Sequence, residues 1–98
     1  MKPNKPNSCE FCQRHLKLTF HHLVPKKMHK DKRVLKMFPD VDLIHFGIWI
    51  CTACHKHLHK SFGHEDLAFY LNEKEKLLRN DKVKRFTNWA SKQRKRIK

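Results

Sequence analysis

The stretch Cys51-Thr-Ala-Cys-His-Lys-His-Leu-His59, CTACHKHLH, carries two cysteines and three histidines. Its C-x2-C pair has an earlier counterpart in Cys9-Glu-Phe-Cys12, and two such pairs are the usual pattern of a four-thiolate zinc site. A chain of 98 residues buries only a marginal hydrophobic core, so a metal that joins distant segments would strongly stabilise it. We therefore predict that structural Zn2+ is bound by Cys9, Cys12, Cys51 and Cys54.

Disulfide bonds are the alternative use of these four cysteines. The amino-terminal stretch MKPNKPNS lacks the apolar core of a secretory signal, and the thiols of intracellular chains stay reduced. No apolar run approaches membrane-spanning length. Metal binding is therefore favoured over disulfides, and we expect a cytoplasmic protein with no membrane partner.

The histidines of the 51–59 stretch separate by helical spacing. His55 and His59 are four residues apart, so a helix stacks them on one face, whereas His57 faces elsewhere and is expected in solvent. Cys54 and His55 diverge by about 100° on the same helix, which argues for two separate metal sites. A single Cys2His2 site, built from Cys51, Cys54, His55 and His59, is the competing arrangement and predicts one ion instead of two.

A third imidazole is available from the stretch LTFHHLVP, residues 18–25, which reads as a strand closed by a proline. Because successive side chains of a strand point to opposite faces, His21 and His22 are expected to have different roles. One would complete a catalytic divalent-cation site with the two helical histidines, leaving positions for water or phosphate oxygen. The other would stay free of metal and serve as a general base at neutral pH.

The remaining sequence predicts a small α+β domain with a helical extension. A long basic loop joins two antiparallel strands, and the last two helices bury apolar residues at helical spacing. The apolar positions expected inside are Leu67, Leu71, Leu77, Leu78, Val83, Phe86 and either Trp89 or Ala90. By their apolar neighbours, Trp49 and Trp89 are both expected to be core anchors. The expected elements are a flexible lead-in at 1–8, strands at 17–24 and 47–51, a loop at 26–46 with a helical turn near 33–38, and helices at 52–60, at 65–79 and from Asp81 as N-cap.

The charge is strongly basic, with 23 Lys and Arg against 9 Asp and Glu and a net charge of +14. Such a surplus favours a polyanionic partner, and nucleic acid is the commonest one inside a cell. A lysine-rich surface that serves only solubility is the alternative interpretation.

The two cysteine pairs, the HHLVP strand and the C-x2-C-H-x3-H stretch together resemble the zinc-knuckle subgroup of the HNH endonucleases over about residues 9–60. That resemblance implies a ββα-metal fold, a hairpin packed on a helix around one divalent cation, and hydrolysis of DNA phosphodiesters. It implies that His21, His55 and His59 hold the cation, as Mg2+, Mn2+, Ni2+ or Zn2+, and that His22 is the general base. The implied divisions are a lead-in at 1–8, a zinc-knuckle nuclease core at 9–64 and a helical extension with a basic tail at 65–98.

One position departs from the family pattern. The asparagine expected shortly before the second cysteine pair is missing, and His45-Phe46-Gly47-Ile48 occupies that region. We predict that His45 takes over its role beside the base. Contacts to DNA phosphates, which position a duplex without reading its sequence, are expected from Lys26, Lys27, Lys30, Arg33, Lys92 and Arg94.

Two function classes follow from these features. The first is a metal-dependent DNA endonuclease of weak or partner-dependent sequence specificity, acting alone, as a homodimer or with a protein partner. The second is a non-catalytic, zinc-ribbon-like module that binds nucleic acid. The presence of His22, which no structural metal site needs, favours the enzyme.

Overall fold

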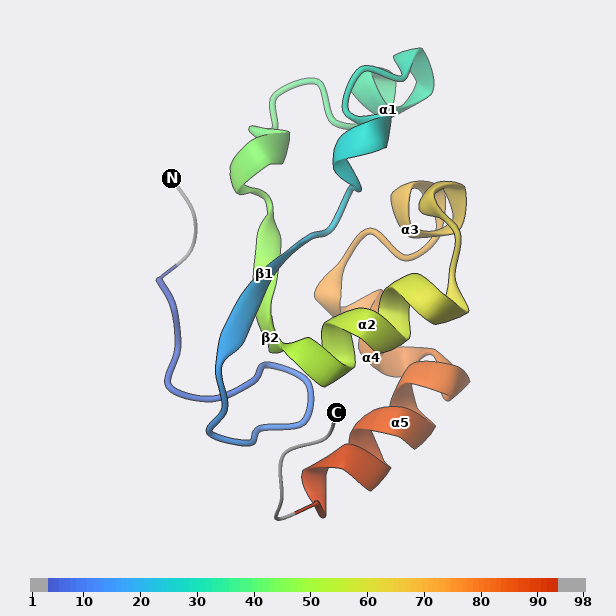
Figure 1. Cartoon of the computed structure of the whole chain (residues 1–98). Helices are drawn as coiled ribbons and strands as arrows, with labels where there is room; N and C mark the ends of the chain where they lie inside the picture. The colour runs from blue at the N-terminus through green and yellow to red at the C-terminus, as the bar shows by residue number, and fades with distance from the viewer. Residues whose placement is uncertain (1–3, 94–98) are drawn as a thin grey trace.

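The computed structural model describes residues 4–93 and contains a two-stranded antiparallel sheet that leads directly into a helix. Strand β1 (Leu18–His22) pairs with β2 (Gly47–Cys51), and α2 (Thr52–Ser61) follows β2 without a loop. Figure 1 shows α2 crossing beside the end of the hairpin. The predicted antiparallel pairing is confirmed, and β1 is shorter than the predicted 17–24 strand.

Because β1 is pleated, its successive side chains point alternately to two different environments. Thr19 and His21 lie on the side that contacts α2, where both meet His55. Phe20 and His22 contact each other in an edge-to-face arrangement, with ring centroids 5.1 Å apart. The two adjacent histidines are therefore in different environments, as the alternation of a strand requires.

The hairpin is unusually tight where β2 begins. Gly47 is paired with His22, and a Cβ added there would lie 2.2 Å from the carbonyl oxygen of His21 and 2.6 Å from the Phe20 ring. Any larger residue would have to displace the backbone of β1. Glycine at this position thus lets the two strands approach closely beside the histidines.

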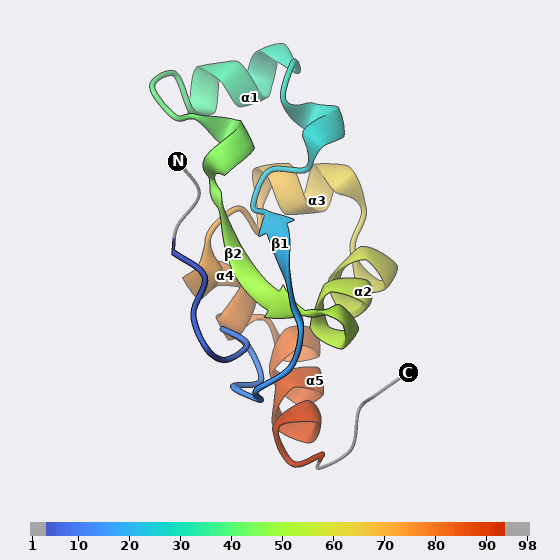
Figure 2. The same ribbon diagram turned by 60° about the vertical axis from the view of Figure 1, so that its left-hand side comes forward.

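The connection between the strands folds into short helical segments with a small core of its own. It contains η1 (Lys26–Met28), α1 (Lys32–Met37) and η2 (Leu43–His45), so the helical turn predicted near 33–38 is confirmed. Figure 2 shows this excursion extending beyond the open end of the hairpin, next to α3 (His64–Phe69). Its apolar contacts form a second buried cluster made of Val24, Val34, Leu43 and Ala68.

The prediction of one helix over 65–79 is wrong, because a non-helical segment separates α3 from α4 (Lys74–Arg79). The buried Asn72 donates its side-chain amide to the carbonyl of Ala68 at 2.9 Å. That carbonyl is the one that the Asn72 backbone N–H would use in a continuous helix, so the side chain replaces the helical bond and the backbone turns away. Between α2 and residue 93, the chain therefore forms three helices instead of the predicted two.

The N-cap of α5 (Asp81–Ser91) is one residue earlier in the sequence than predicted. Asn80, not Asp81, is the N-cap, and its side chain accepts from the backbone N–H groups of Lys82 and Val83. Val83 is buried as expected. At the far end Ala90 takes the core position and Trp89 stays half exposed, so its predicted role as a core residue is wrong.

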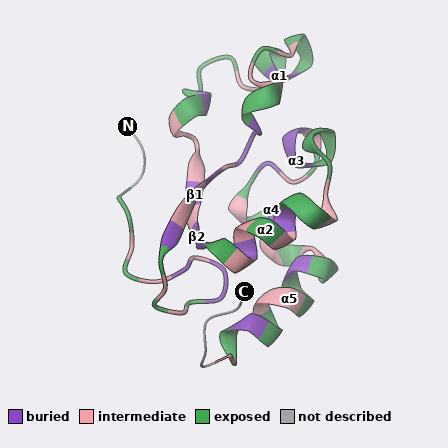
Figure 3. Cartoon of the chain, viewed as in Figure 1, coloured by how far each residue is buried: buried purple, intermediate pink, exposed green. Residues whose placement is uncertain are grey.

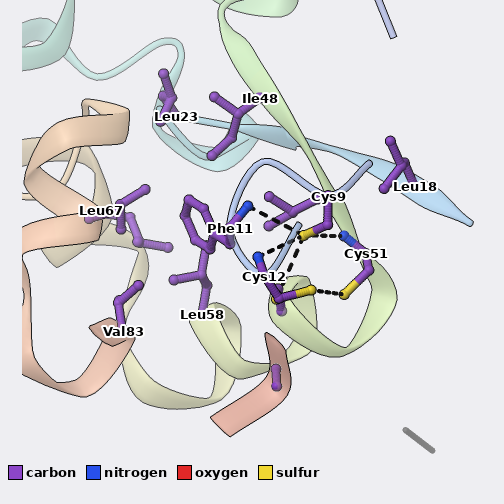
Figure 4. Close-up of a cluster of buried hydrophobic side chains, with 14 residues drawn as sticks. Cys9, Phe11, Cys12, Leu18, Leu23, Ile48, Cys51, Leu58, Leu67 and Val83 are labelled. Carbon is purple, nitrogen blue, oxygen red and sulfur yellow. Dashed lines mark hydrogen bonds between the residues drawn. The ribbon is translucent and has the colours of Figure 1, made fainter. Parts of the chain in front are cut away.

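The main core joins the cysteine loop, the sheet and the helices. Figure 3 shows buried segments on the inner sides of β2, α2 and α5, and Figure 4 shows Phe11 packed among Leu58, Leu67 and Val83, next to the cysteine sulfurs. Trp49 packs against this cluster with part of its surface exposed, as Leu71, Leu78 and Phe86 also do. Within residues 4–93, no helix is long and apolar enough to cross a membrane.

Candidate metal centres

The four cysteine sulfurs converge at the junction of the first loop, β2 and α2. The sulfurs of Cys9 and Cys54 are 3.8 Å apart, as are those of Cys12 and Cys51, and all four residues are buried. Tetrahedral zinc with Zn–S bonds of about 2.3 Å places neighbouring sulfurs about 3.8 Å apart. The four cysteines are thus positioned to bind a metal such as zinc, and the mixed Cys2His2 grouping is not the one the chain adopts.

The surroundings of the sulfurs suit thiolates. The Cys9 sulfur accepts hydrogen bonds from three backbone N–H groups, those of Phe11, Cys12 and Cys51, at 3.3 to 3.4 Å. The Arg14 guanidinium donates to the sulfurs of Cys12 and Cys51 at 3.3 and 3.7 Å. These donors and this cation offset the negative charge of a zinc ion with four thiolate ligands.

The pKa values of two of the thiols are also changed by their neighbours in the cysteine cluster. Hydrogen bonds with Cys54 and Cys9 lower the pKa of the Cys51 thiol to about 3. Close contact with Cys51 and Cys9, together with burial, raises the pKa of Cys54 above its ordinary value. In the absence of metal the Cys54 thiol therefore retains its proton, which metal binding would release.

A second cluster consists of three histidines from two elements. His21 of β1 lies against His55 and His59 of α2, with ring centroids 5.2 and 5.5 Å away, and the two helical rings are 4.9 Å apart. One ring nitrogen from each lies within 4.8 Å of the others. The i, i+4 spacing in α2 thus brings together the pair that the sequence singles out, and the strand histidine that joins them is His21.

The burial, the unpartnered ring nitrogens and the lowered pKa of His21 all suit a metal ligand. The residue is fully buried, yet among the described residues neither of its ring nitrogens has a hydrogen-bond partner. Burial, and the neighbouring His55 and His59, lower its pKa to about 3, and burial lowers that of His55 to about 4. The imidazoles are therefore neutral at pH 7, and a bound cation would satisfy an otherwise costly buried nitrogen.

Thr19 fixes the orientation and tautomer of His55. Its hydroxyl is 3.0 Å from the carbonyl oxygen of Ile50 and 2.8 Å from Nδ1 of His55. Because the carbonyl can only accept and the hydroxyl has one proton, both bonds form only when Nδ1–H of His55 donates to Thr19. Nε2 of His55 is then unprotonated and available to a metal.

A groove opens beside the histidine cluster. It has a volume of about 350 Å³, and its lining consists of His22, Pro25, Lys26, Lys27, His55, His59 and His64. His22 is half-buried, and its ring lies 5.1 Å from that of Phe20 and 5.9 Å from that of His29. His29 is itself anchored, since its Nε2–H donates to the carbonyl of Val24 at 2.7 Å. The groove thus combines two cluster histidines, His22 and two exposed lysines.

The other predicted site residues lie elsewhere or have different contacts. His45 is in η2, where its Nδ1 contacts the carboxylate of Asp42, so the structure does not bring it to the histidine cluster. Arg33 is exposed but forms an ion pair with Asp31 at 3.0 Å and lies over the Phe69 ring. Lys30 is exposed, Lys92 is exposed at the C-cap of α5, and Arg94 lies outside the described residues.

Several residues of these centres were not anticipated from the sequence. Thr19 is two residues before His21, and strand alternation could have placed it on the same face. Arg14 follows the first cysteine pair, but nothing in the sequence indicates that its side chain reaches Cys51. Glu10 accepts from the backbone N–H of Trp49 and from Lys74 of α4, tying the cysteine loop to the helical extension.

These features define a small α+β protein with a cluster of four cysteines positioned for a metal such as zinc and a separate cluster of three histidines. The chain is 31% identical to the "Uncharacterized protein YisB" of Bacillus subtilis (strain 168) over 86 residues, which cover 87% of this chain and 74% of YisB. It therefore belongs to the same family as YisB. No family model matches the chain, and no solved structure matches it.

Proposed function

We propose that this protein is a metal-dependent DNA endonuclease of the HNH type, with a ββα-metal core at β1, β2 and α2. The observation that carries the proposal is the buried His21, whose two ring nitrogens have no hydrogen-bond partner among the described residues and which faces His55 and His59. The resemblance of the HHLVP and C-x2-C-H-x3-H stretches to that family supports the same proposal. The four-cysteine site would hold structural zinc and fix the hairpin against α2.

Three imidazoles that leave open positions suit a catalytic site better than a closed structural one. A divalent cation held by His21, His55 and His59 would supply charge neutralisation at the phosphate and help for the departing oxygen. Thr19 keeps Nε2 of His55 unprotonated for that purpose. The low pKa of His21 keeps its imidazole neutral well below pH 7.

His22 is the proposed general base. It lines the same groove as His55 and His59, and Phe20 and His29 flank its ring. In this role an unprotonated ring nitrogen of His22 accepts a proton from the attacking water. Imidazole as a side chain is suited to this task near neutral pH.

Lysines at the edge of the groove would position the DNA. Lys26 and Lys27 line it directly, and both are exposed. Contacts from such side chains go to phosphates and carry no sequence information, so we expect weak sequence specificity and a steep dependence of affinity on salt. The net charge of +14 agrees with a DNA partner.

The test is cleavage of supercoiled and linear DNA with added Mg2+, Mn2+ or Ni2+ and with a chelator control. We expect cation-dependent nicking by the wild-type protein and its loss in His22→Ala, with zinc content and DNA affinity unchanged. His15→Ala, which removes an exposed histidine that belongs to neither cluster, is the matched control and should cleave normally.

Two results would overturn the proposal. Cleavage by the His22→Ala protein at the wild-type rate would exclude His22 as base. If the wild-type protein binds DNA but leaves it intact with every cation, the non-catalytic nucleic-acid-binding module becomes the better description.

A further inference from the structure

A row of aromatic rings lies on the side of the molecule where α2 meets α5. The imidazole of His57 stacks on the Phe86 ring with centroids 4.1 Å apart and an angle of 9° between the planes. Trp89 continues the row, 5.7 Å from Phe86. Figures 1 and 2 both show α2 and α5 side by side. His57, which the sequence predicts in solvent, is thus half-buried and part of an aromatic surface.

This aromatic face is open, because the core position at the end of α5 belongs to Ala90. Half of the Trp89 side chain remains exposed. A groove of about 370 Å³ runs along the face, and its lining consists of His57, Lys82, Arg85, Phe86 and Trp89. Exposing a large aromatic surface to water is unfavourable, so a bound partner that covers it would gain apolar contact.

The charge of the groove restricts the partner. Lys82 and Arg85 both line the groove. Arg85 precedes Trp89 by four residues on α5, and the ammonium of Lys82 lies 5.8 Å from the centroid of the Phe62 ring. The five lining residues include two basic side chains and no acidic one. A second copy of the chain would bring together two molecules of net charge +14, which mutual repulsion disfavours.

We propose that this aromatic face binds an unpaired nucleobase of a nucleic-acid strand, which stacks on Trp89 and Phe86 while the flanking phosphates contact Lys82 and Arg85. Stacking platforms bordered by cations are the general means by which proteins hold single strands, because every base has an aromatic face. A base inside a duplex is covered on both sides by its neighbours. The face therefore selects single-stranded or locally opened nucleic acid over intact duplex.

This site is separate from the histidine cluster. His57 is two residues from both His55 and His59, which places it on another side of α2. The inference goes beyond the proposed cleavage and needs no catalytic cation. It can therefore hold if the nuclease fails, and it can fail if the nuclease holds.

The experiment measures binding of fluorescent oligonucleotides to the zinc-loaded protein without added divalent cation, by polarisation at fixed salt. The probes are a dT12 strand, an abasic strand of equal length and charge, and a blunt duplex. The variants are Trp89→Leu and Trp89→Phe, with Tyr70→Leu as a matched control that removes another exposed aromatic residue, outside this groove. Zinc content and circular dichroism confirm the fold of each variant.

We expect the wild-type protein to bind dT12 more tightly than the abasic strand by roughly 5- to 150-fold, the range that corresponds to stacking of one base. Trp89→Leu should abolish that difference while its duplex affinity stays within about twofold of wild type, whereas Trp89→Phe and Tyr70→Leu should retain it. Equal binding of dT12 and the abasic strand by the wild-type protein would overturn the proposal. So would concentration-dependent dimers in sedimentation that disappear in Trp89→Leu, since the face would then be a contact between copies.

Discussion

Replacement of Thr19 by valine tests how the histidine cluster is organised for metal. Valine keeps the β-branched shape that suits a strand but has no hydroxyl, so the bonds to Ile50 and His55 are both lost. Nδ1 of His55 then has no fixed acceptor, and either ring nitrogen can carry the proton. Only the fraction protonated at Nδ1 presents Nε2 to a cation.

Loss of such an outer partner typically weakens metal binding by about 10- to 100-fold. This corresponds to roughly 1.4 to 2.7 kcal/mol of binding free energy. Thr19→Ser keeps the hydroxyl and should bind within a few-fold of wild type. The change at Thr19 therefore separates the hydrogen bond from the packing of the side chain.

The assay is calorimetric titration of Ni2+ or Co2+ into protein whose cysteine site already holds zinc. Nitrogen-15 NMR of the histidine rings in the same protein, before titration, reports the tautomer of His55 directly. We expect protonation at Nδ1 in the wild-type and Thr19→Ser proteins and a mixture in Thr19→Val. Wild-type affinity in Thr19→Val, or protonation at Nε2 of His55 in the wild-type protein, would refute the assignment.

Two further predictions concern the hairpin and the cysteines. Gly47→Ala places a methyl group 2.2 Å from the carbonyl oxygen of His21, so overpacking should lower the free energy of unfolding by about 1 to 3 kcal/mol and weaken metal binding. Gly63→Ala, with no atom within 4 Å of the added Cβ, is the control, and equal denaturation midpoints for the two variants would contradict this reasoning. Removal of zinc by a strong chelator, or Cys9→Ser, should abolish cooperative thermal unfolding, because thiolate zinc contributes on the order of 10 kcal/mol, about the whole stability of a small domain. A zinc-free protein with an unchanged melting transition would show that the core suffices without metal.

The sequence by itself determined those features that depend on spacing along one element. Two C-x2-C pairs predicted the four-cysteine cluster, and the i, i+4 pair His55 and His59 predicted a shared helical face, because a helix turn brings those positions together wherever it lies. The alternation of β1 likewise predicted different surroundings for His21 and His22. Local periodicity is enough for the two histidine results, whereas the two cysteine pairs were joined because four-thiolate zinc sites usually have that form.

The helical extension shows where local periodicity failed. Its apolar spacing is continuous through 65–79, but the side chain of Asn72 takes the carbonyl of Ala68 and ends α3. Trp89 and Ala90 were equally acceptable core positions by spacing, but Ala90 is the one buried in the main cluster and Trp89 stays half exposed. Such outcomes depend on the space between elements, which periodicity within one element does not contain.

The tertiary structure also decided which residues distant in sequence contact the candidate metal centres. The hairpin register brings Ile50 opposite Thr19, so that the Thr19 hydroxyl can bond to both Ile50 and His55. The loop after Cys12 brings Arg14 to the sulfur of Cys51. These partners are 31 to 37 residues apart, and their hydrogen bonds are 2.8 to 3.7 Å long, a closeness that only the folded backbone can provide.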